Sequence, residues 1–198
     1  MITFYFLRHG TKQFIPFDPP LTELGLRQAD MTAEFLKTIS FKLIISSHKL
    51  RTQQTAKAVA KKTGIEVMTD KRLQERLEWE IDKSFEEFLK EWWKTDRDRR
   101  YKPEKGESSQ GKGLLMRGVI DEISEKYKEG KFLIVTHGGS IGDLLRNLFT
   151  EEAIPHKTDS VSDTRFIELL ECSLTIIQKS KDKFKLLELN NTSHLSNL

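Results

Sequence analysis

The sequence predicts an α/β fold, in which a mostly parallel central sheet is covered by helices on both faces to form a three-layer α/β/α sandwich. Three segments indicate this fold: "ITFYFLRHG", "LIISSHKLR" and "FLIVTHGGS". Each begins with a short apolar run without polar alternation, which is typical of strands that are buried on both faces of a parallel sheet. Each run then ends on polar or basic residues and is followed by a helical pattern.

The helix after the first strand is expected to begin at Thr22, whose hydroxyl group can cap the first turn. Its apolar positions lie on one stripe, formed by Leu24, Met31, Phe35 and Ile39. Such a stripe is typical of an amphipathic helix that packs against a sheet. We therefore expect this stripe to face the core.

The second and third strands are also followed by helical patterns. The helix after the second strand is expected to begin at Ser46 or Ser47 and to stop at Gly64, because glycine readily adopts the left-handed conformation that ends a helix. The helix after the third strand has apolar residues at the spacing i, i+3, i+4 and i+7, namely Ile141, Leu144, Leu145 and Leu148.

The middle of the chain, residues 79–113, is helical at first, then highly charged, then rich in glycine and serine. We interpret this segment as a helical lid that is inserted into the fold. A further helix is expected within residues 109–130, and two strands are expected around a turn at Lys181 and Asp182, where they would close one side of the sheet. The chain of 198 residues, 1–198, is expected to form a single domain.

Composition excludes several classes of protein. The 33 basic and 30 acidic residues give a net charge of +3, which is too small to indicate a nucleic-acid partner. Cys172 is the only cysteine, and the apolar run Ile2–Leu7 is too short for a signal peptide or a membrane span. We therefore expect a cytoplasmic protein without a nucleic-acid or membrane partner. Nothing in the sequence indicates an oligomeric state.

Four basic or imidazole side chains lie at or just beyond the ends of the apolar strands, namely Arg8, His9, Arg51 and His137. The carboxyl ends of parallel strands share one edge of a sheet, so these side chains are expected to meet there. Such a pocket, with little local acid to balance it, needs an anion. Guanidinium groups match phosphate oxygens, and the backbone amides around Gly138 and Gly139 add donors at a helix start.

The histidines could instead suggest a metal site, since zinc is often held by histidine with aspartate, glutamate or cysteine. The spacing argues against this, because the sequence has no His-x-x-x-His pair and no cysteine cluster. The stretch "GESSQGKG" is not a nucleotide-binding loop either, because Gly113 stands where that loop needs serine or threonine. We therefore expect neither a metal nor a cofactor.

Four blocks resemble the signature blocks of the histidine phosphatase superfamily, also called phosphoglycerate mutase-like: "LRHG", "SSHKLRTQQTA", "RLQERLEW" and "VTHGGSIGDLL". They occur in the order typical of the family. The phrases "PLTELGLRQA", "KGESSQGKG" and "LNNTSHL" are also similar to family segments, so the resemblance covers nearly the whole chain. The chain looks most like the broad-specificity phosphatase branch.

The resemblance implies a role for each matching residue of the pocket. His9 matches the nucleophile that becomes phosphorylated, and His137 matches the second histidine of the pocket. Arg8 and Arg51 match the arginines that hold the phosphoryl oxygens. The backbone at Gly138 is expected to bind the same substrate group, because it lies at a helix start. A neutral imidazole is a good nucleophile near neutral pH, and nearby arginines disfavour a proton on it while they stabilise the phosphoryl group.

The resemblance also implies that Glu75, in Leu-x-Glu-Arg, is the general acid. Glu78 and Glu80 are neighbours that could take this role, because the sequence lacks the glycine that the family often shows before its Trp-Glu pair. The acid must be protonated when it gives a proton to the leaving oxygen, and it can then act as the base for water. This chemistry predicts an acidic to neutral pH optimum.

The expected activity is that of a histidine acid-type phosphatase, a phosphoric monoester hydrolase that acts on a small phosphorylated metabolite. A phosphoglycerate mutase is the first alternative, although the segment "TKQFIPFDP" is short and lacks the Glu-Ser and Trp-Asn pairs of mutases. A protein phosphohistidine phosphatase is the second. A catalytically dead scaffold is disfavoured, because all five expected site residues are present.

Overall fold

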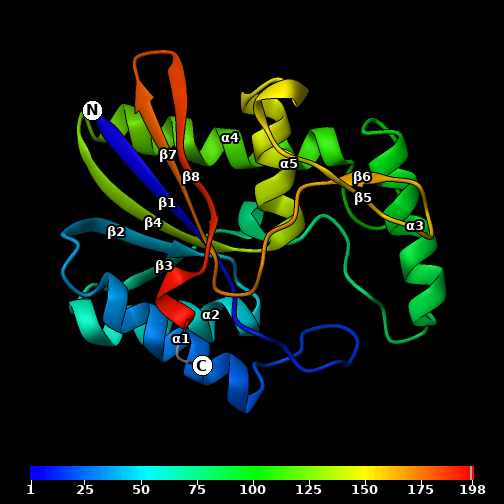
Figure 1. Ribbon diagram of the computed structural model, residues 1–198, viewed down its shortest axis with the longest axis horizontal. Helices are drawn as coiled ribbons and strands as arrows, with labels where there is room; N and C mark the ends of the chain where they lie inside the picture. Colours follow the sequence, from blue (N-terminus) through cyan, green and yellow to red (C-terminus); the bar gives the residue numbers. More distant parts are fainter. Residues whose placement is uncertain (197) are drawn as a thin grey trace.

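The central sheet of the computed structural model has six strands in the order β3-β2-β4-β1-β7-β8, counted over the described residues 1–196 and 198 (Figure 1). They are β1 (Ile2–Arg8), β2 (Phe41–Ser46), β3 (Val67–Thr69), β4 (Gly130–Thr136), β7 (Leu174–Ser180) and β8 (Lys183–Asn191). The first four run parallel, whereas β7 is antiparallel to both β1 and β8. The mostly parallel sheet is therefore confirmed, and the two late strands extend it on the β1 side.

Helices cover both faces of this sheet, as expected. The long helices against the sheet are α1 (Glu23–Leu36), α2 (Leu50–Thr63), α4 (Ser109–Lys126) and α5 (Gly138–Leu148). Figure 1 shows α1 and α2 on one face and α4 and α5 on the other. Side chains of β1 serve both layers, because Leu7 packs in the core of α1 and α2 whereas Phe4 and Phe6 pack in the core of α4 and α5. This is the three-layer α/β/α arrangement.

The start of α1 agrees with the sequence, but its buried face does not. The Thr22 hydroxyl accepts a hydrogen bond from the Gly25 amide at 3.0 Å, so the predicted cap is correct. The predicted apolar stripe is wrong at two positions, because Leu24 is 42% exposed and Phe35 is 49% exposed, whereas Ile39, just beyond the helix, packs against the core. Small residues face the core instead, namely Gly25, Ala29, Thr32 and Ala33, with Leu36 at the end. A Cβ atom on Gly25 would lie 2.1 Å from the Thr11 carbonyl oxygen, so the backbone passes too close for large side chains there.

The predictions for the two helices after β2 and β4 are confirmed except at the start of α2. Neither Ser46 nor Ser47 caps α2, because Ser46 completes β2 and the cap position is Lys49, which makes no side-chain cap. Helix α2 does end at Gly64, whose φ of 72° lies in the left-handed region. In α5 the predicted core positions Ile141, Leu144 and Leu145 are buried, and Leu148 is partly buried against the same core.

The segment before α4 forms η1 (Lys71–Leu73) and then α3 (Phe85–Arg97). Ser84 and Glu87 cap α3 reciprocally through side-chain and backbone groups. Among α3 residues only Thr95 is buried, so the helix lies outside the main layers, with the short strands β5 (Lys157–Thr158) and β6 (Arg165–Phe166) beside it (Figure 1). The remaining short helices are η2 (Glu151–Ala153) and η3 (Ser193–Leu195).

Helix α4 begins at Ser109 and ends at Lys126, so the helix predicted within residues 109–130 is confirmed. Gly130 belongs to β4 and has a φ of 131°, a conformation that suits the turn into a strand rather than a helix. None of the helices in the described part of the chain is both long and apolar enough to cross a lipid bilayer.

Candidate active site

The carboxyl ends of β1, β2 and β4 meet at one edge of the sheet. Arg8 is paired with Thr136 and Ser46 with Val135, so the three strands end at nearly the same level. The residue after β1 is His9 and the residue after β4 is His137. Their rings lie edge to face with centroids 5.2 Å apart. The predicted meeting of the strand ends is therefore observed.

The ring of His9 is held in one tautomer by its two neighbours. Its Nδ1 lies 2.8 Å from the Gly10 carbonyl oxygen, which can only accept, so the proton must be on Nδ1. Its Nε2 accepts a hydrogen bond from Arg51 Nε at 3.3 Å. Burial lowers the pKa of His9 well below its usual value, and Arg51 and Arg8 lower it further. The ring is therefore neutral near pH 7, with its lone pair on Nε2.

His137 is buried beside His9 and has one free ring nitrogen. Its Nε2 lies 3.1 Å from the Ser47 hydroxyl, whereas its Nδ1 is buried and has no hydrogen-bond partner among the described residues. Burial, followed by Arg51 and His9, lowers the pKa of His137 well below its usual value. The site therefore contains two neutral imidazoles.

The two arginines approach His9 from different elements. Arg8 lies at the end of β1, and its guanidinium donates to the Leu169 carbonyl oxygen and pairs with Glu171 at 2.6 Å. Arg51 lies in the first turn of α2, where its Nη2 donates to both carboxylate oxygens of Glu78 at 3.1 and 3.2 Å. Within the described chain, Arg8 Nε and Arg51 Nη1 are buried without a hydrogen-bond partner.

The expectation that little acid balances these arginines is wrong. Glu171 pairs with Arg8, Glu78 pairs with Arg51, and Asp18 lies 3.6 Å from Arg51 Nη1. The acids come from three loops that are distant in the sequence, so their approach depends on tertiary structure. The charged side chains of the site are therefore nearly balanced rather than strongly positive.

Glu75 lies on the α5 side of the site. Its carboxylate accepts hydrogen bonds from the Gly139 amide at 3.1 Å and from the Ser140 hydroxyl at 3.1 Å, at the amino end of α5. A Cβ atom on Gly139 would lie 2.5 Å from the Trp92 ring and 2.7 Å from Glu75, so the indole of α3 covers this carboxylate. Gly138 lies next to the Arg8 side chain, which its Cβ would approach at 3.3 Å.

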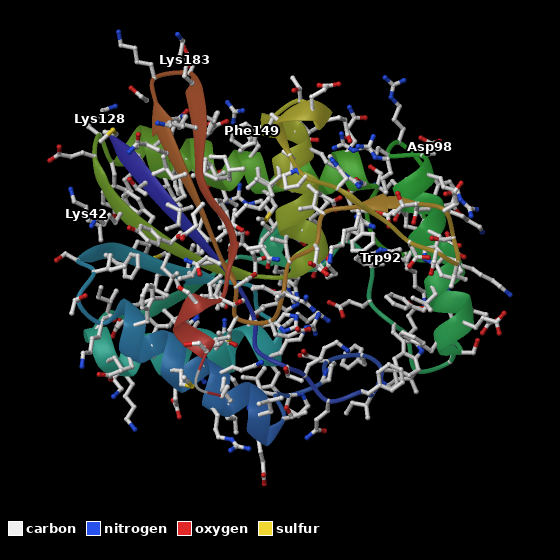
Figure 2. The ribbon with its side chains drawn as sticks, viewed as in Figure 1. Lys42, Trp92, Asp98, Lys128, Phe149 and Lys183 are labelled. Atoms are coloured by element: carbon white, nitrogen blue, oxygen red, sulfur yellow. The ribbon has the colours of Figure 1, made fainter. Side chains whose placement is uncertain are left out.

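Arg8, His9, Arg51 and Glu75 open into a cavity of about 600 Å³, whereas His137 is fully buried and does not line it. Its floor contains Arg8, His9, Arg51, Glu75 and Glu78, and its outer wall is largely aromatic. The aromatic residues of the wall are Phe14, Phe17, Trp79, Phe85, Phe88, Trp92, Trp93 and Phe166. In Figure 2, Trp92 lies between α3 and the body of the fold. The cavity is much larger than a phosphoryl group alone requires.

A buried ion network attaches α3 to this site. Arg76 follows Glu75 directly, and its guanidinium pairs with Asp143 of α5 at 2.7 Å and with Asp96 of α3 at 2.5 Å. It also stacks on the Trp92 ring, with its Cζ atom 3.9 Å from the centroid. Burial raises the pKa of Asp143 to about 6, although Arg76 opposes this rise. The network thus connects the outer helix to the segment that presents Glu75.

The structure brings together all six residues predicted for the site, namely Arg8, His9, Arg51, Glu75, His137 and Gly138. Sequence reasoning missed Ser47 as the partner of His137, and Asp18 and Glu171 as partners of the arginines. Ser47 follows directly after an apolar strand, the same signal that identified His9 and His137. Nothing in the local sequence distinguishes Asp18 or Glu171 from other surface acids.

Comparison with known proteins agrees with this geometry. Residues 4–192 match the family model of the histidine phosphatase superfamily (branch 1). A curated relative, the "Probable phosphoglycerate mutase GpmB" of Yersinia pestis, is 32% identical over 188 residues, which cover 88% of this chain and 84% of that protein.

Solved structures share the fold at lower identity. A mycobacterial glucosyl-3-phosphoglycerate phosphatase in complex with VO3 has a TM-score of 0.77 at 23% identity and covers 96% of this chain and 99% of its own. A phosphoglycerate mutase from Bacillus anthracis has a TM-score of 0.73 at 22% identity, and the match covers 98% of this chain and 95% of that protein. With its family model matched across almost all of its length, the chain belongs to the histidine phosphatase superfamily.

Proposed function

We propose that this protein is a phosphatase that hydrolyses phosphomonoesters through a phosphohistidine intermediate on His9. One observation supports this most strongly: Arg8 and Arg51 line the same cavity as the neutral ring of His9, and each has a buried donor, Arg8 Nε and Arg51 Nη1, without a hydrogen-bond partner in the described chain. Buried polar groups are nearly always paired, so unpaired ones at a cavity indicate a ligand that completes them. A tetrahedral oxyanion has the charge and the acceptor oxygens for this purpose.

In the first step, the Nε2 lone pair of His9 attacks phosphorus and the bond between phosphorus and the ester oxygen breaks. Glu75 gives its proton to that oxygen, which leaves as an alcohol. In the second step, Glu75 takes a proton from water, the water oxygen attacks phosphorus, and the N–P bond breaks to release phosphate. Arg8 and Arg51 stabilise the charge of the transferring group in both steps.

The size and lining of the cavity favour a phosphatase over a mutase. A mutase must keep a small acid close to its phosphohistidine and exclude water, whereas this cavity of about 600 Å³ has an aromatic wall suited to a larger alcohol group. The curated relative named as a mutase supports the alternative at the level of sequence. We propose that the substrate is a small phosphorylated metabolite whose alcohol group is larger than that of phosphoglycerate. The insert at residues 79–113 acts as a lid, and residues 1–198 form a single domain.

Two further properties belong to this proposal. The arginines supply the charge stabilisation that a metal gives in other phosphatases, so activity should persist in excess chelator. The single cysteine, Cys172, is buried and free, which suits a reducing cytoplasmic location.

A screen of phosphorylated metabolites for phosphate release tests the proposal. It should include 3-phosphoglycerate with a trace of 2,3-bisphosphoglycerate, a phosphohistidine-containing protein and aryl phosphates. The wild type should release phosphate, His9→Ala should not, and the exposed His48→Ala should behave as the wild type. Rapid isomerisation of phosphoglycerate without phosphate release would instead establish a mutase, and unaltered turnover by His9→Ala would exclude the nucleophile.

A further inference from the structure

Glu78 lines the cavity beside Arg51 and is an acidic residue that the proposed chemistry does not use. It comes from the same short segment as Glu75 but lies on the opposite side of the cavity floor, against α2. Its side chain is 23% exposed, and both of its oxygens accept hydrogen bonds from Arg51 Nη2. Lys49 Nζ lies 3.6 Å from the same carboxylate. Glu78 is thus built into the arginine side of the pocket.

The guanidinium of Arg51 touches both Glu78 and the proposed nucleophile. Its Nε donates to His9 Nε2 at 3.3 Å while its Nη2 holds Glu78 at 3.1 Å. A phosphoryl group bonded to or approaching His9 Nε2 must therefore place its oxygens beside Arg51, close to the Glu78 carboxylate. Two anions would then share one guanidinium, which disfavours the ionised form of one of them.

The charges around Glu78 determine whether Glu78 or the bound anion takes up a proton. Positive charges face it from Arg51, Lys49, Lys12 and Lys112, and Glu75 is the negative neighbour on its own segment. Burial nevertheless raises the pKa of Glu78 above its usual value, against the opposing effect of Arg51. A phosphate dianion that arrives beside it adds negative charge, and this raises the affinity of Glu78 for a proton further.

We propose that the Glu78 carboxylate occupies the arginine side of the anion site in the free protein and takes up a proton from solvent when a dianionic oxyanion binds beside His9. The inference rests on the proposed function only in using the same anion site. The new O–H bond lets Glu78 donate to an oxygen of the bound anion, while its other oxygen can still accept from Arg51. Glu78 is thus a positioning residue that makes anion binding dependent on pH, whereas Glu75 remains the proton donor to the leaving group.

The test is calorimetric titration of the free protein with inorganic sulfate, a dianion that does not itself titrate near neutral pH. Each titration is run in two buffers with different enthalpies of protonation, so the proton uptake is obtained directly. The wild type should take up close to one proton, and its affinity should fall by up to about tenfold for each pH unit above the pKa of free Glu78. Glu78→Gln should bind sulfate more tightly near neutral pH, with little uptake and a flat pH dependence.

Three variants serve as controls. Glu75→Gln should keep the proton uptake of the wild type, and Glu78→Asp, which keeps a carboxylate, should restore much of the pH dependence. Glu80→Gln should change nothing, because Glu80 pairs with Lys105 and Lys83 outside the cavity lining. Thermal melting of each variant shows that it is folded.

The outcomes separate this inference from the proposed function. Sulfate binding with equal proton uptake in the wild type and Glu78→Gln, or uptake lost in Glu75→Gln, would overturn the role of Glu78 and leave the anion site intact. Failure of sulfate to bind, or binding that survives Arg51→Met unchanged, would overturn the anion site and both proposals with it.

Discussion

The floor of the cavity and its outer wall are built in different ways. The floor consists mainly of side chains at the end of β1 and in the first turn of α2, where His9 and Arg51 are buried, and His137 at the end of β4 packs against His9. Half of the aromatic residues of the wall come from α3, in which only Thr95 is buried. The floor is therefore fixed by the rigid sheet, whereas the wall is attached through a few contacts such as Arg76 with Asp96. We infer that the floor determines the chemistry and that the wall selects the alcohol group.

The largest effect on stability is expected where the two regions are joined. Arg76→Met leaves Asp143 buried without its cation and leaves Asp96 with only the more distant Arg146 at 3.8 Å, which should lower the free energy of unfolding by about 3–5 kcal/mol. Urea denaturation measures this loss. The control Arg117→Met removes a partly exposed pair with Asp121 and should cost about 0–1 kcal/mol.

The pH dependence of this loss sharpens the comparison. Because burial raises the pKa of Asp143 to about 6, the carboxyl group can take up a proton below that pH and no longer needs the cation. The cost of Arg76→Met should therefore be smaller in mildly acidic solution than at neutral pH. An equal cost at both pH values, or a cost no greater than that of the control, would show that the network does not join α3 to the fold.

A change in the floor should reduce the rate without unfolding the protein. Arg51→Met removes a donor beside His9, and kcat/KM for phosphomonoesters should fall by about 10²–10³-fold, which is about 2.7–4 kcal/mol of transition-state stabilisation. Steady-state kinetics measure this, with Lys57→Met on the same helix as a control. A loss that appears only in KM would mean that Arg51 binds the ground state and the transition state equally.

The two buried imidazoles predict that stability falls in acid. The pKa values of His9 and His137 lie well below their usual 6.5, so below this pH the unfolded chain takes up protons that the folded protein cannot hold. Their contribution to stability is fully present above pH 6.5 and is lost as the pH falls below it, by up to about 1.4 kcal/mol per pH unit for each ring.

The variant His9→Gln isolates one of these rings. Between neutral pH and about pH 5, its free energy of unfolding should fall less than that of the wild type, because one of the two imidazoles is absent. Urea denaturation at the two pH values measures this difference. Protonation of Asp143 in acid stabilises the folded protein, because burial raises the pKa of this group. This effect is the same in both proteins and therefore cancels when they are compared. Equal acid sensitivity of the two proteins would mean that His9 can be protonated in the folded state.

The smallest effect is expected in the wall. Phe88 of α3 lines the outer cavity, so Phe88→Ala should raise KM for aryl phosphates by about threefold to tenfold, as expected for the loss of an aromatic contact, and leave kcat nearly unchanged. Small phosphomonoesters should be affected less. The control is Phe35→Ala on α1, which stacks on His194 away from the cavity. A fall in kcat for every substrate would instead mean that Phe88 supports the chemical step, as the residues of the cavity floor do.

The same contrast explains what the sequence could predict. Strand ends and the α5 core follow from local patterns, because a continuous apolar run and the i, i+3, i+4, i+7 spacing each determine which side chains are buried. The buried face of α1 could not be predicted in this way, since the close approach of Thr11 to Gly25 is a tertiary contact. Likewise, the pairing of Glu78 with Arg51 and of Glu171 with Arg8 joins residues 27 and 163 positions apart.

The most direct test of the account is to trap the phosphorylated enzyme. The protein is mixed with a radiolabelled phosphomonoester, quenched rapidly under alkaline conditions and digested, and the labelled peptide is identified by mass spectrometry. We predict an acid-labile, alkali-stable phosphoryl group on His9 that disappears as phosphate is released. Turnover with no label on His9 at any time, or with the label on another residue, would contradict the account.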